Sequence, residues 1–77
     1  MIINVFTSQN CMPCRFTKRW LDKHGFEYNE LKAEEYADIL REQGLSSAPV
    51  VSIVFEDGKE ETFNGYRPNY LQELLLS

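Results

Sequence analysis

The sequence predicts a small α/β fold with the element order β-α-β-α-β-β-α, in which three helices flank a four-stranded mixed sheet. Three observations predict it. Short apolar runs of strand length alternate with segments of helical period, glycines follow the first two helical segments, and an Asp-Gly pair separates the last two strand-like runs. Because the chain has only 77 residues and no repeat or linker-like tract, we expect a single domain over residues 1–77.

The first part of the chain predicts a strand followed by a helix. Residues 2–6 are mostly apolar and β-branched, and a polar cluster follows them, which is typical of a buried strand that enters a loop. Gly25 supplies the left-handed residue that commonly ends a helix. Between these points, over residues 12–24, four apolar or small side chains follow the i, i+3, i+4, i+7 pattern of one helix face: Thr17, Trp20, Leu21 and His24.

The middle of the chain predicts a second strand and a second helix. Residues 26–31 lie between a glycine and a charged run, and we expect them to form the strand. Residues 33–43 repeat the helical pattern, Glu34 and Glu35 suit the positive end of the helix dipole, and Gly44 closes the helix.

The last part of the chain predicts a hairpin and a final helix. Residues 50–55 form a continuous apolar strand, Asp57-Gly58 is a strong turn signal, and residues 60–63 return. Pro68 then suits the first turn of a helix. Helices between the first three strands predict parallel crossovers, the hairpin adds one antiparallel strand, and helices should cover both faces of the sheet. The final helix should bury three residues that share a face: Leu71, Leu74 and Leu75.

Composition and charge narrow the classes of function. The chain is 43% hydrophobic and 26% charged, and no stretch approaches the ~20 apolar residues of a membrane span. A net charge of −4 argues against nucleic-acid binding, which rests on clustered Lys and Arg. The apolar N-terminus lacks the basic leader and the cleavage site of a signal peptide. We therefore expect a cytoplasmic monomer that binds neither nucleic acid nor membrane.

Cys11 and Cys14 form a C-x-x-C pair between the first predicted strand and the first predicted helix. Because the cytosol keeps thiols reduced, the pair is more typical of redox chemistry or metal binding than of a permanent structural bridge. Cys14 lies three residues before Thr17 and so falls on the core face of the helix, whereas Cys11 occupies the N-cap region. The two sulfurs are therefore unequal by position.

This inequality predicts separate roles for the two thiols. Unpaired N–H groups and the helix dipole stabilise an anion at the start of a helix, and such settings lower a thiol pKa from about 8.5 to between roughly 3.5 and 7.5. We expect Cys11 to be the nucleophile that attacks a substrate disulfide and Cys14 to be the resolving thiol. Pro13 stiffens the turn between them without losing a hydrogen bond, and Met12 is expected on the partner surface.

Metal binding is the main alternative for an isolated C-x-x-C pair. A tetrahedral structural zinc site needs four ligands, and the one further soft ligand, His24, is predicted at the far end of the same helix. We therefore expect no metal in the monomer. A binding module in which Cys11 holds a metal or an iron–sulfur cluster between two subunits is a third hypothesis from another class.

The Ala48-Pro49 pair directly precedes the strand predicted over residues 50–55. Proline is tolerated at the start of a strand. From these residues alone an ordinary trans bond is the expectation, because only ~5% of X-Pro bonds in folded proteins are cis.

Segments spread over essentially the whole chain carry a family resemblance: Cys11-Met12-Pro13-Cys14, Ala48-Pro49-Val50-Val51, Asp57-Gly58 and Gly65-Tyr66-Arg67-Pro68. Together they resemble the NrdH-redoxins, glutaredoxin-like electron donors of the thioredoxin superfamily. The resemblance implies a thioredoxin fold in which Pro49 is cis and faces the two cysteines, and in which the backbone beside it, at Ala48, pairs with an extended substrate segment.

The same resemblance implies the electron path. It implies reduction of the Cys11–Cys14 disulfide by NADPH through thioredoxin reductase, with no bound cofactor. It also implies delivery of electrons to a ribonucleotide reductase for deoxyribonucleotide synthesis.

Ordinary glutaredoxins, which use glutathione as reductant, are the alternative family. They typically carry a Lys three residues before the nucleophile and a Gly-Gly pair followed by an acidic residue, whereas this chain has Ser8, Gly65-Tyr66-Arg67 and Asn69 at those places. The usual contacts to glutathione are thus absent. Two departures from the NrdH pattern bear on the choice of reductase: Pro13 replaces the more usual Gln, and Asn69 replaces an Asp.

The segment that begins at Gly65 is the last candidate for partner binding. Tyr66 either packs beside the dithiol or belongs to the core. Arg67 either holds the loop or contacts a partner, or it is a solvated charge at the start of a helix.

Overall fold

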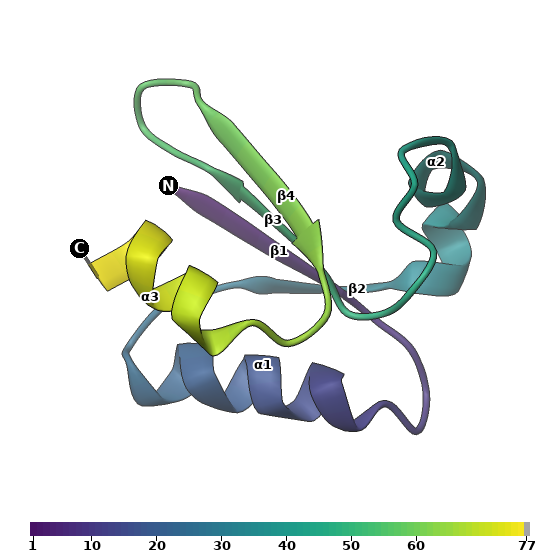
Figure 1. The fold of residues 1–77 in the computed structure, drawn as a ribbon, viewed down its shortest axis with the longest axis horizontal. Helices are drawn as coiled ribbons and strands as arrows, with labels where there is room; N and C mark the ends of the chain where they lie inside the picture. Colours follow the sequence, from purple (N-terminus) through teal and green to yellow (C-terminus); the bar gives the residue numbers. More distant parts are fainter. Residues whose placement is uncertain (77) are drawn as a thin grey trace.

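The computed structural model describes residues 1–76 of the chain. The element order is the predicted one, with a short 3-10 turn added before the second helix (Figure 1). The bounds are β1 (Ile2–Thr7), α1 (Met12–Lys23), β2 (Asn29–Lys32), η1 (Ala33–Tyr36), α2 (Ala37–Glu42), β3 (Val50–Val54), β4 (Glu60–Asn64) and α3 (Pro68–Leu76).

The four strands form one mixed sheet in the order β2-β1-β3-β4, which confirms the predicted fold class. β1 pairs with β2 in parallel, with Val5 opposite Glu30. β1 pairs with β3 and β3 with β4 in antiparallel fashion, and Val51 lies opposite both Val5 and Phe63. The expectation that the first three strands would all be parallel is therefore wrong for β3.

The short helix α2 explains the direction of β3. β2 ends with Lys32 opposite Thr7, and β3 begins with Val50 opposite Phe6, so both lie at the carboxyl end of β1. A parallel crossover would need a segment that returns along the sheet. The helix α2 has only 6 residues and rises about 9 Å, so it stays at this end and β3 runs back.

Two helices cover one face of the sheet. Helices α1 and α3 lie on the same side of the sheet (Figure 1). Side chains of successive strand residues alternate between faces, and Ile3 and Val5 of β1 pack in one cluster with residues of both helices. Leu21 of α1 and Leu71 of α3 are fully buried there. The core cluster consists of Ile3, Val5, Leu21, Val51, Ile53, Phe63 and Leu71.

The other face is covered at one end, by η1 and α2. The ring of Phe6 contacts the ring of Tyr36 edge-on at 5.1 Å, and Leu40 is buried on this side of the molecule. The predicted helix over residues 33–43 is thus split into a 3-10 turn and a shorter α-helix.

Both helices that precede a glycine end as the sequence predicts. Gly25 has φ +77°, its N–H donates to the carbonyl of Asp22, and the N–H of Phe26 donates to the carbonyl of Leu21. Gly44 ends α2 in the same way. In this arrangement the residue after the glycine still belongs to the helix end. The second strand was expected over residues 26–31, and it begins three residues later, at Asn29, because Phe26 closes α1 and packs against the core.

The part of the chain that the structure describes contains no helix that is both long and apolar enough to cross a bilayer.

Candidate dithiol active site

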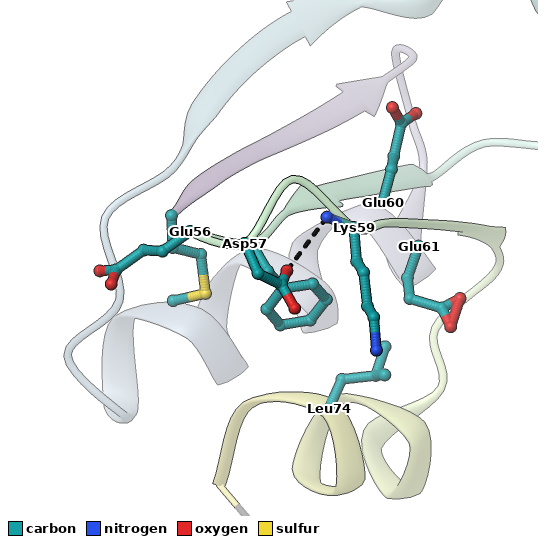
Figure 2. A pocket seen from close by; sticks show the side chains of 8 residues that line it. Glu56, Asp57, Lys59, Glu60, Glu61 and Leu74 are labelled. Carbon is teal, nitrogen blue, oxygen red and sulfur yellow. Dashed lines mark hydrogen bonds between the residues drawn. The ribbon is translucent and has the colours of Figure 1, made fainter.

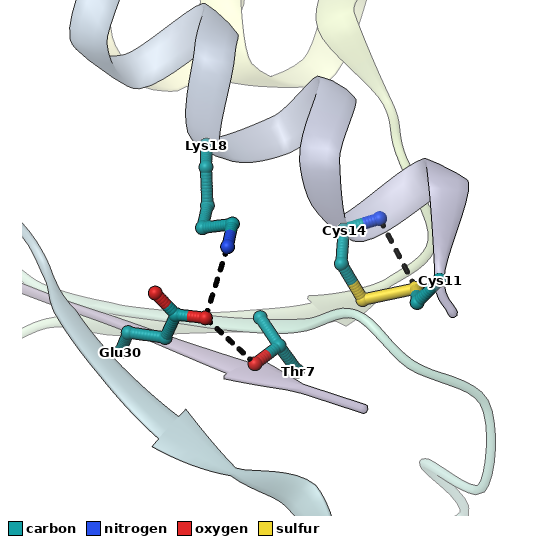
Figure 3. Close-up of polar contacts among 5 residues, drawn as sticks. All are labelled: Thr7, Cys11, Cys14, Lys18 and Glu30. Carbon is teal, nitrogen blue, oxygen red and sulfur yellow. Dashed lines mark hydrogen bonds and ion pairs between the residues drawn. A yellow bond between two sulfur atoms is a disulfide. The ribbon is translucent and has the colours of Figure 1, made fainter. Parts of the chain in front are cut away.

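The first helix begins at the C-x-x-C pair. Cys11 is the N-cap residue of α1, with extended backbone angles (φ −110°, ψ 102°), and its Sγ accepts the N–H of Cys14 at 3.1 Å. Cys11 and Cys14 are joined by a disulfide, with 5.3 Å between their Cα atoms (Figure 3). The N-cap sulfur therefore takes the place that a Ser or Asp oxygen usually fills.

The two sulfurs differ in their access to solvent. Cys14 is 2% exposed and lies on the buried side of α1 with Thr17 and Leu21. Cys11 is only partly buried, and Met12 beside it is exposed. A partner that approaches the disulfide therefore meets Cys11 first.

The turn between the cysteines is held from inside the helix. Pro13 lies at the start of α1, where no backbone N–H is needed. The hydroxyl of the buried Thr17 donates to the Pro13 carbonyl at 2.9 Å. Outside, the Arg15 guanidinium lies 3.9 Å from the Met12 sulfur. Of the two residues between the cysteines, Pro13 is therefore held by a hydrogen bond from the buried Thr17, whereas the side chain of Met12 is exposed.

The segment before β3 lies at the same end of the sheet as the dithiol. The Ala48–Pro49 peptide bond is cis, as the family resemblance implies, which corrects the trans expectation drawn from the residues alone. Pro49 is fully buried, and its carbonyl accepts the N–H of Gly65 at 2.8 Å. This hydrogen bond ties the end of β4 to the loop that enters β3. A hollow of about 270 Å³ opens next to this loop, with Ser8 and Ala48 on its border.

The segment that follows Gly65 reaches α1 through one aromatic side chain. The Tyr66 ring lies 5.7 Å from the Phe16 ring, centre to centre, and Tyr66 also packs against the core. Tyr66 thus contacts both the core and the helix that carries the dithiol. Arg67 is exposed, and its carbonyl accepts the N–H of Leu71 in the first turn of α3. Phe16, to which the sequence assigned no role, is 40% exposed beside Tyr66.

A polar network that sequence reasoning missed lies near the dithiol (Figure 3). One carboxylate oxygen of Glu30 accepts both the Lys18 ammonium and the Thr7 hydroxyl, each at 3.0 Å. The hydrogen bond from Lys18 is the main cause that holds the pKa of the Glu30 carboxyl below its usual range. The partial burial of Glu30 acts in the opposite direction and raises this pKa. The sequence holds one signal for this network: Lys18 follows Cys14 by four residues, the spacing that places two residues on the same face of a helix.

Metal ligands do not gather elsewhere in residues 1–76. This part of the chain holds no cluster of three or more His, Cys, Asp or Glu side chains that could bind a metal ion. His24 caps the far end of α1, with its ring 4.1 Å from that of Trp20, so it does not complete a site with the cysteines.

Figure 2 shows a second hollow, of about 810 Å³, lined in part by Met1. Because Met1 precedes β1 and Cys11 follows it, the hollow lies at the opposite end of the sheet from the dithiol. Met1, Phe55 and Leu74 give it an apolar floor, and the carboxylates of the β3–β4 hairpin surround it. Within the hairpin, the N–H of Lys59 donates to the Asp57 carboxylate at 3.1 Å. This hollow is too remote to take part in chemistry at Cys11.

Comparison with known proteins shows the family. The sequence model of the Glutaredoxin family matches residues 3–58. The glutaredoxin-like protein NrdH of Lactococcus lactis subsp. cremoris is 31% identical over 95% of this chain and 99% of its own length. NrdH of Salmonella typhimurium is 32% identical over 96% of this chain and 89% of its own.

The solved structure of NrdH-redoxin from Escherichia coli is similar over the whole chain. It superposes with a TM-score of 0.83 at 30% identity, covering 100% of this chain and 99% of that one. The chain belongs to the NrdH-redoxin family of glutaredoxin-like proteins. As an NrdH-redoxin it is a thiol-disulfide oxidoreductase, and Cys11–Cys14 is its redox-active pair. The glutaredoxin of Archaeoglobus fulgidus, 20% identical with a TM-score of 0.72 over 97% of this chain and 86% of that one, shares the NrdH-redoxin fold.

Proposed function

We propose that this NrdH-redoxin reduces protein disulfides with Cys11 as the nucleophile and Cys14 as the resolving thiol. The observation that carries the assignment is the unequal setting of the two sulfurs: Cys11 is accessible at the helix N-cap and accepts an N–H, whereas Cys14 is buried. A backbone N–H at a helix start favours the thiolate, which is the attacking species in disulfide exchange.

The exchange proceeds in two balanced steps. The Cys11 thiolate attacks one sulfur of the substrate disulfide, a mixed disulfide forms, and the other substrate sulfur leaves as a thiolate. Cys14 then loses its proton and attacks the Cys11 sulfur, which restores the Cys11–Cys14 disulfide and releases the second substrate sulfur. Two electrons pass to the substrate, and the burial of Cys14 keeps solvent thiols from reaching it first.

Cysteine variants test the assignment of roles. Cys11→Ser should abolish disulfide reduction, because no accessible thiolate remains. Cys14→Ser should still attack and should accumulate a mixed disulfide with the partner, visible on non-reducing gels and removed by dithiothreitol. Full activity of the Cys11 variant would refute the mechanism.

The electron donor and acceptor are inferred from the similarity of this chain to NrdH proteins. We infer that thioredoxin reductase, with NADPH, reduces the pair in the cytoplasm, and that a ribonucleotide reductase receives the electrons for deoxyribonucleotide synthesis. The support is the near-complete match to NrdH proteins, one of which, from Escherichia coli, has a thioredoxin-like activity profile. Partner contact is assigned to exposed or half-buried residues around the pair: Met12, Pro13, Ala48, Gly65, Tyr66 and Arg67, with the buried Pro49 shaping the loop.

A donor comparison tests this inference. The oxidised protein is supplied with NADPH and either thioredoxin reductase or glutathione with glutathione reductase. NADPH consumption is followed in both arms, with a protein disulfide as final acceptor. We expect turnover with thioredoxin reductase and at least tenfold less with glutathione, because Ser8 and Asn69 replace the usual glutathione contacts. Faster turnover with glutathione would instead make this chain a glutaredoxin in activity.

A further inference from the structure

Lys18 lies on the buried face of α1, the helix that carries the dithiol. The buried residues of α1 are Cys14, Thr17 and Leu21, and Lys18 completes their i, i+3, i+4, i+7 pattern. Its side chain is 28% exposed, whereas lysine side chains in folded proteins are mostly exposed. Residues four apart on a helix have Cβ atoms roughly 6 Å from each other. The side chains of Lys18 and Cys14 both leave α1 toward the sheet (Figure 3).

Glu30 fixes this ammonium and offsets its charge. The Lys18 Nζ lies 3.0 Å from a Glu30 carboxylate oxygen, and the same oxygen accepts the hydroxyl of Thr7. Thr7 is the last residue of β1, after which the chain enters the Cys11 loop. Glu30 therefore joins the two elements between which the dithiol is held (Figure 3).

The charge of the dithiol changes during the reaction, whereas the charge of the network does not. Reduction breaks the Cys11–Cys14 bond, adds two electrons and leaves Cys11 as a thiolate and Cys14 as a thiol, with one proton taken from solvent. The reduced site is therefore one charge more negative than the oxidised site. A nearby cation favours the reduced form, and a nearby anion favours the oxidised form.

We propose that Lys18 and Glu30 are positioning residues that set the reduction potential of the Cys11–Cys14 pair by opposing charges. Lys18 favours the dithiol, and Glu30 holds Lys18 in place and limits its effect. The other ionisable group that faces Glu30 is Tyr28, and burial together with Asp22 and Glu30 raises the pKa of this phenol, so it stays neutral near pH 7. The Arg15 guanidinium, next to Met12, adds a positive charge that is the same in every variant of Lys18 and Glu30, so changes in the field between these variants come from the ion pair.

The test measures the equilibrium of the full-length protein with reduced and oxidised dithiothreitol at pH 7 and an ionic strength of about 0.15 M. Glu30→Gln should shift the equilibrium about threefold toward the dithiol, and Lys18→Met about threefold toward the disulfide. A threefold change corresponds to about 14 mV, because tenfold is 29.6 mV for a two-electron couple. The double variant Lys18→Met with Glu30→Gln should return close to the wild-type value.

Matched controls separate charge from structure. Lys23→Met and Glu27→Gln remove the same charges from exposed residues, and Lys23 is nine residues beyond Cys14, about 13 Å along the helix axis. That distance exceeds the Debye length of about 8 Å at this ionic strength. Glu27 lies between the end of α1 and the start of β2, beyond Lys23 along the chain, so both controls should keep the wild-type equilibrium. A purely structural pair would shift the two single variants in the same direction, which would overturn the proposal, as would equal shifts in the controls.

A charge swap keeps the proposal testable if a single variant does not fold. Lys18→Glu combined with Glu30→Lys preserves the ion pair but places the anion on the helix beside Cys14. The equilibrium should then move toward the disulfide, and an unchanged equilibrium would refute the proposal. The inference rests on the role of Cys11 proposed above, yet it uses a small dithiol, so failure of either partner protein in the donor comparison leaves this result unaffected.

Discussion

Cys11 and Cys14 carry the same thiol, and their surroundings separate them. The Sγ of Cys11 accepts a backbone N–H at the start of a helix, whereas Cys14 faces the core. The spacing of the pair and the helical period before Thr17 were enough to predict this difference. The cis bond at Pro49 was not, because the residue types at an X-Pro bond do not determine the isomer, and only the resemblance supplied it.

The thiol of Cys11 should therefore titrate at lower pH than that of Cys14. Because the N–H of Cys14 and the helix dipole stabilise the thiolate, we expect a Cys11 pKa below the ordinary value of about 8.5. Thiolate absorbance near 240 nm in the reduced Cys14→Ser variant measures it directly, with Cys11→Ser as the matched control. A Cys14→Ser variant that titrates at 8.5 or above would contradict the expectation.

Thr17 supports the active-site turn from a fully buried position. Its hydroxyl donates to the Pro13 carbonyl, and its methyl group packs in the core. Thr17→Val keeps the shape and removes the donor, so the free energy of unfolding should fall by about 1 kcal/mol. Urea unfolding measures the change. Thr62→Val, at a hydroxyl that is not buried, should cost less, and equal costs would argue against a specific role for the buried hydrogen bond.

At the scale of elements, local signals were reliable at helix ends and weak for strand direction. Gly25 and Gly44 end their helices where the sequence placed them. The direction of β3 depends on how far α2 carries the chain, and a helix of 6 residues is too short for the crossover that the pattern of elements suggested. The order of the elements does not predict the length of α2. A 3-10 turn at residues 33–36 takes the place of the first part of the predicted helix, which leaves α2 short.

The end of α1 provides a test at this scale. Gly25 has φ +77°, and a Cβ there would meet no atom within 4 Å, so an added side chain changes the backbone energy and little else. Gly25→Ala should lower the free energy of unfolding by about 1–2 kcal/mol. Gly25→Asn should cost less, because Asn adopts the left-handed conformation more readily. Chemical unfolding of the two variants measures both values, and the reverse order would contradict this account of the helix end.

At the scale of the whole molecule, the Lys18–Glu30 pair joins residues that are 12 apart in sequence. No local pattern predicts it, because α1 and β2 meet only when the sheet is assembled. The register that sets Glu30 opposite Val5 turns the carboxylate toward the helix face of the sheet. Sequence reasoning therefore identified the dithiol, whose parts are neighbours in the chain, and missed the charges that folding brings beside it.

The same pair should make the stability of the protein depend on pH. Because Lys18 lowers the pKa of Glu30 in the folded state, the unfolded chain binds more protons in acid, and the contribution of the pair is lost as the pH falls from about 4.3, the ordinary Glu pKa, through the folded pKa. The contribution should stay below ~1 kcal/mol, because the Glu30 side chain is 47% exposed.

Urea unfolding of the wild type and of Lys18→Met at pH 7, 5, 4 and 3 measures this contribution. Their free energies should differ at pH 7 and approach each other as the pH falls and the carboxyl takes up its proton in both proteins. Lys23→Met, which lacks such a carboxylate partner in the structure of residues 1–76, should show no such convergence. A difference between wild type and Lys18→Met that stays constant across this range would mean that Lys18 acts through the packing of its methylene chain rather than through its charge.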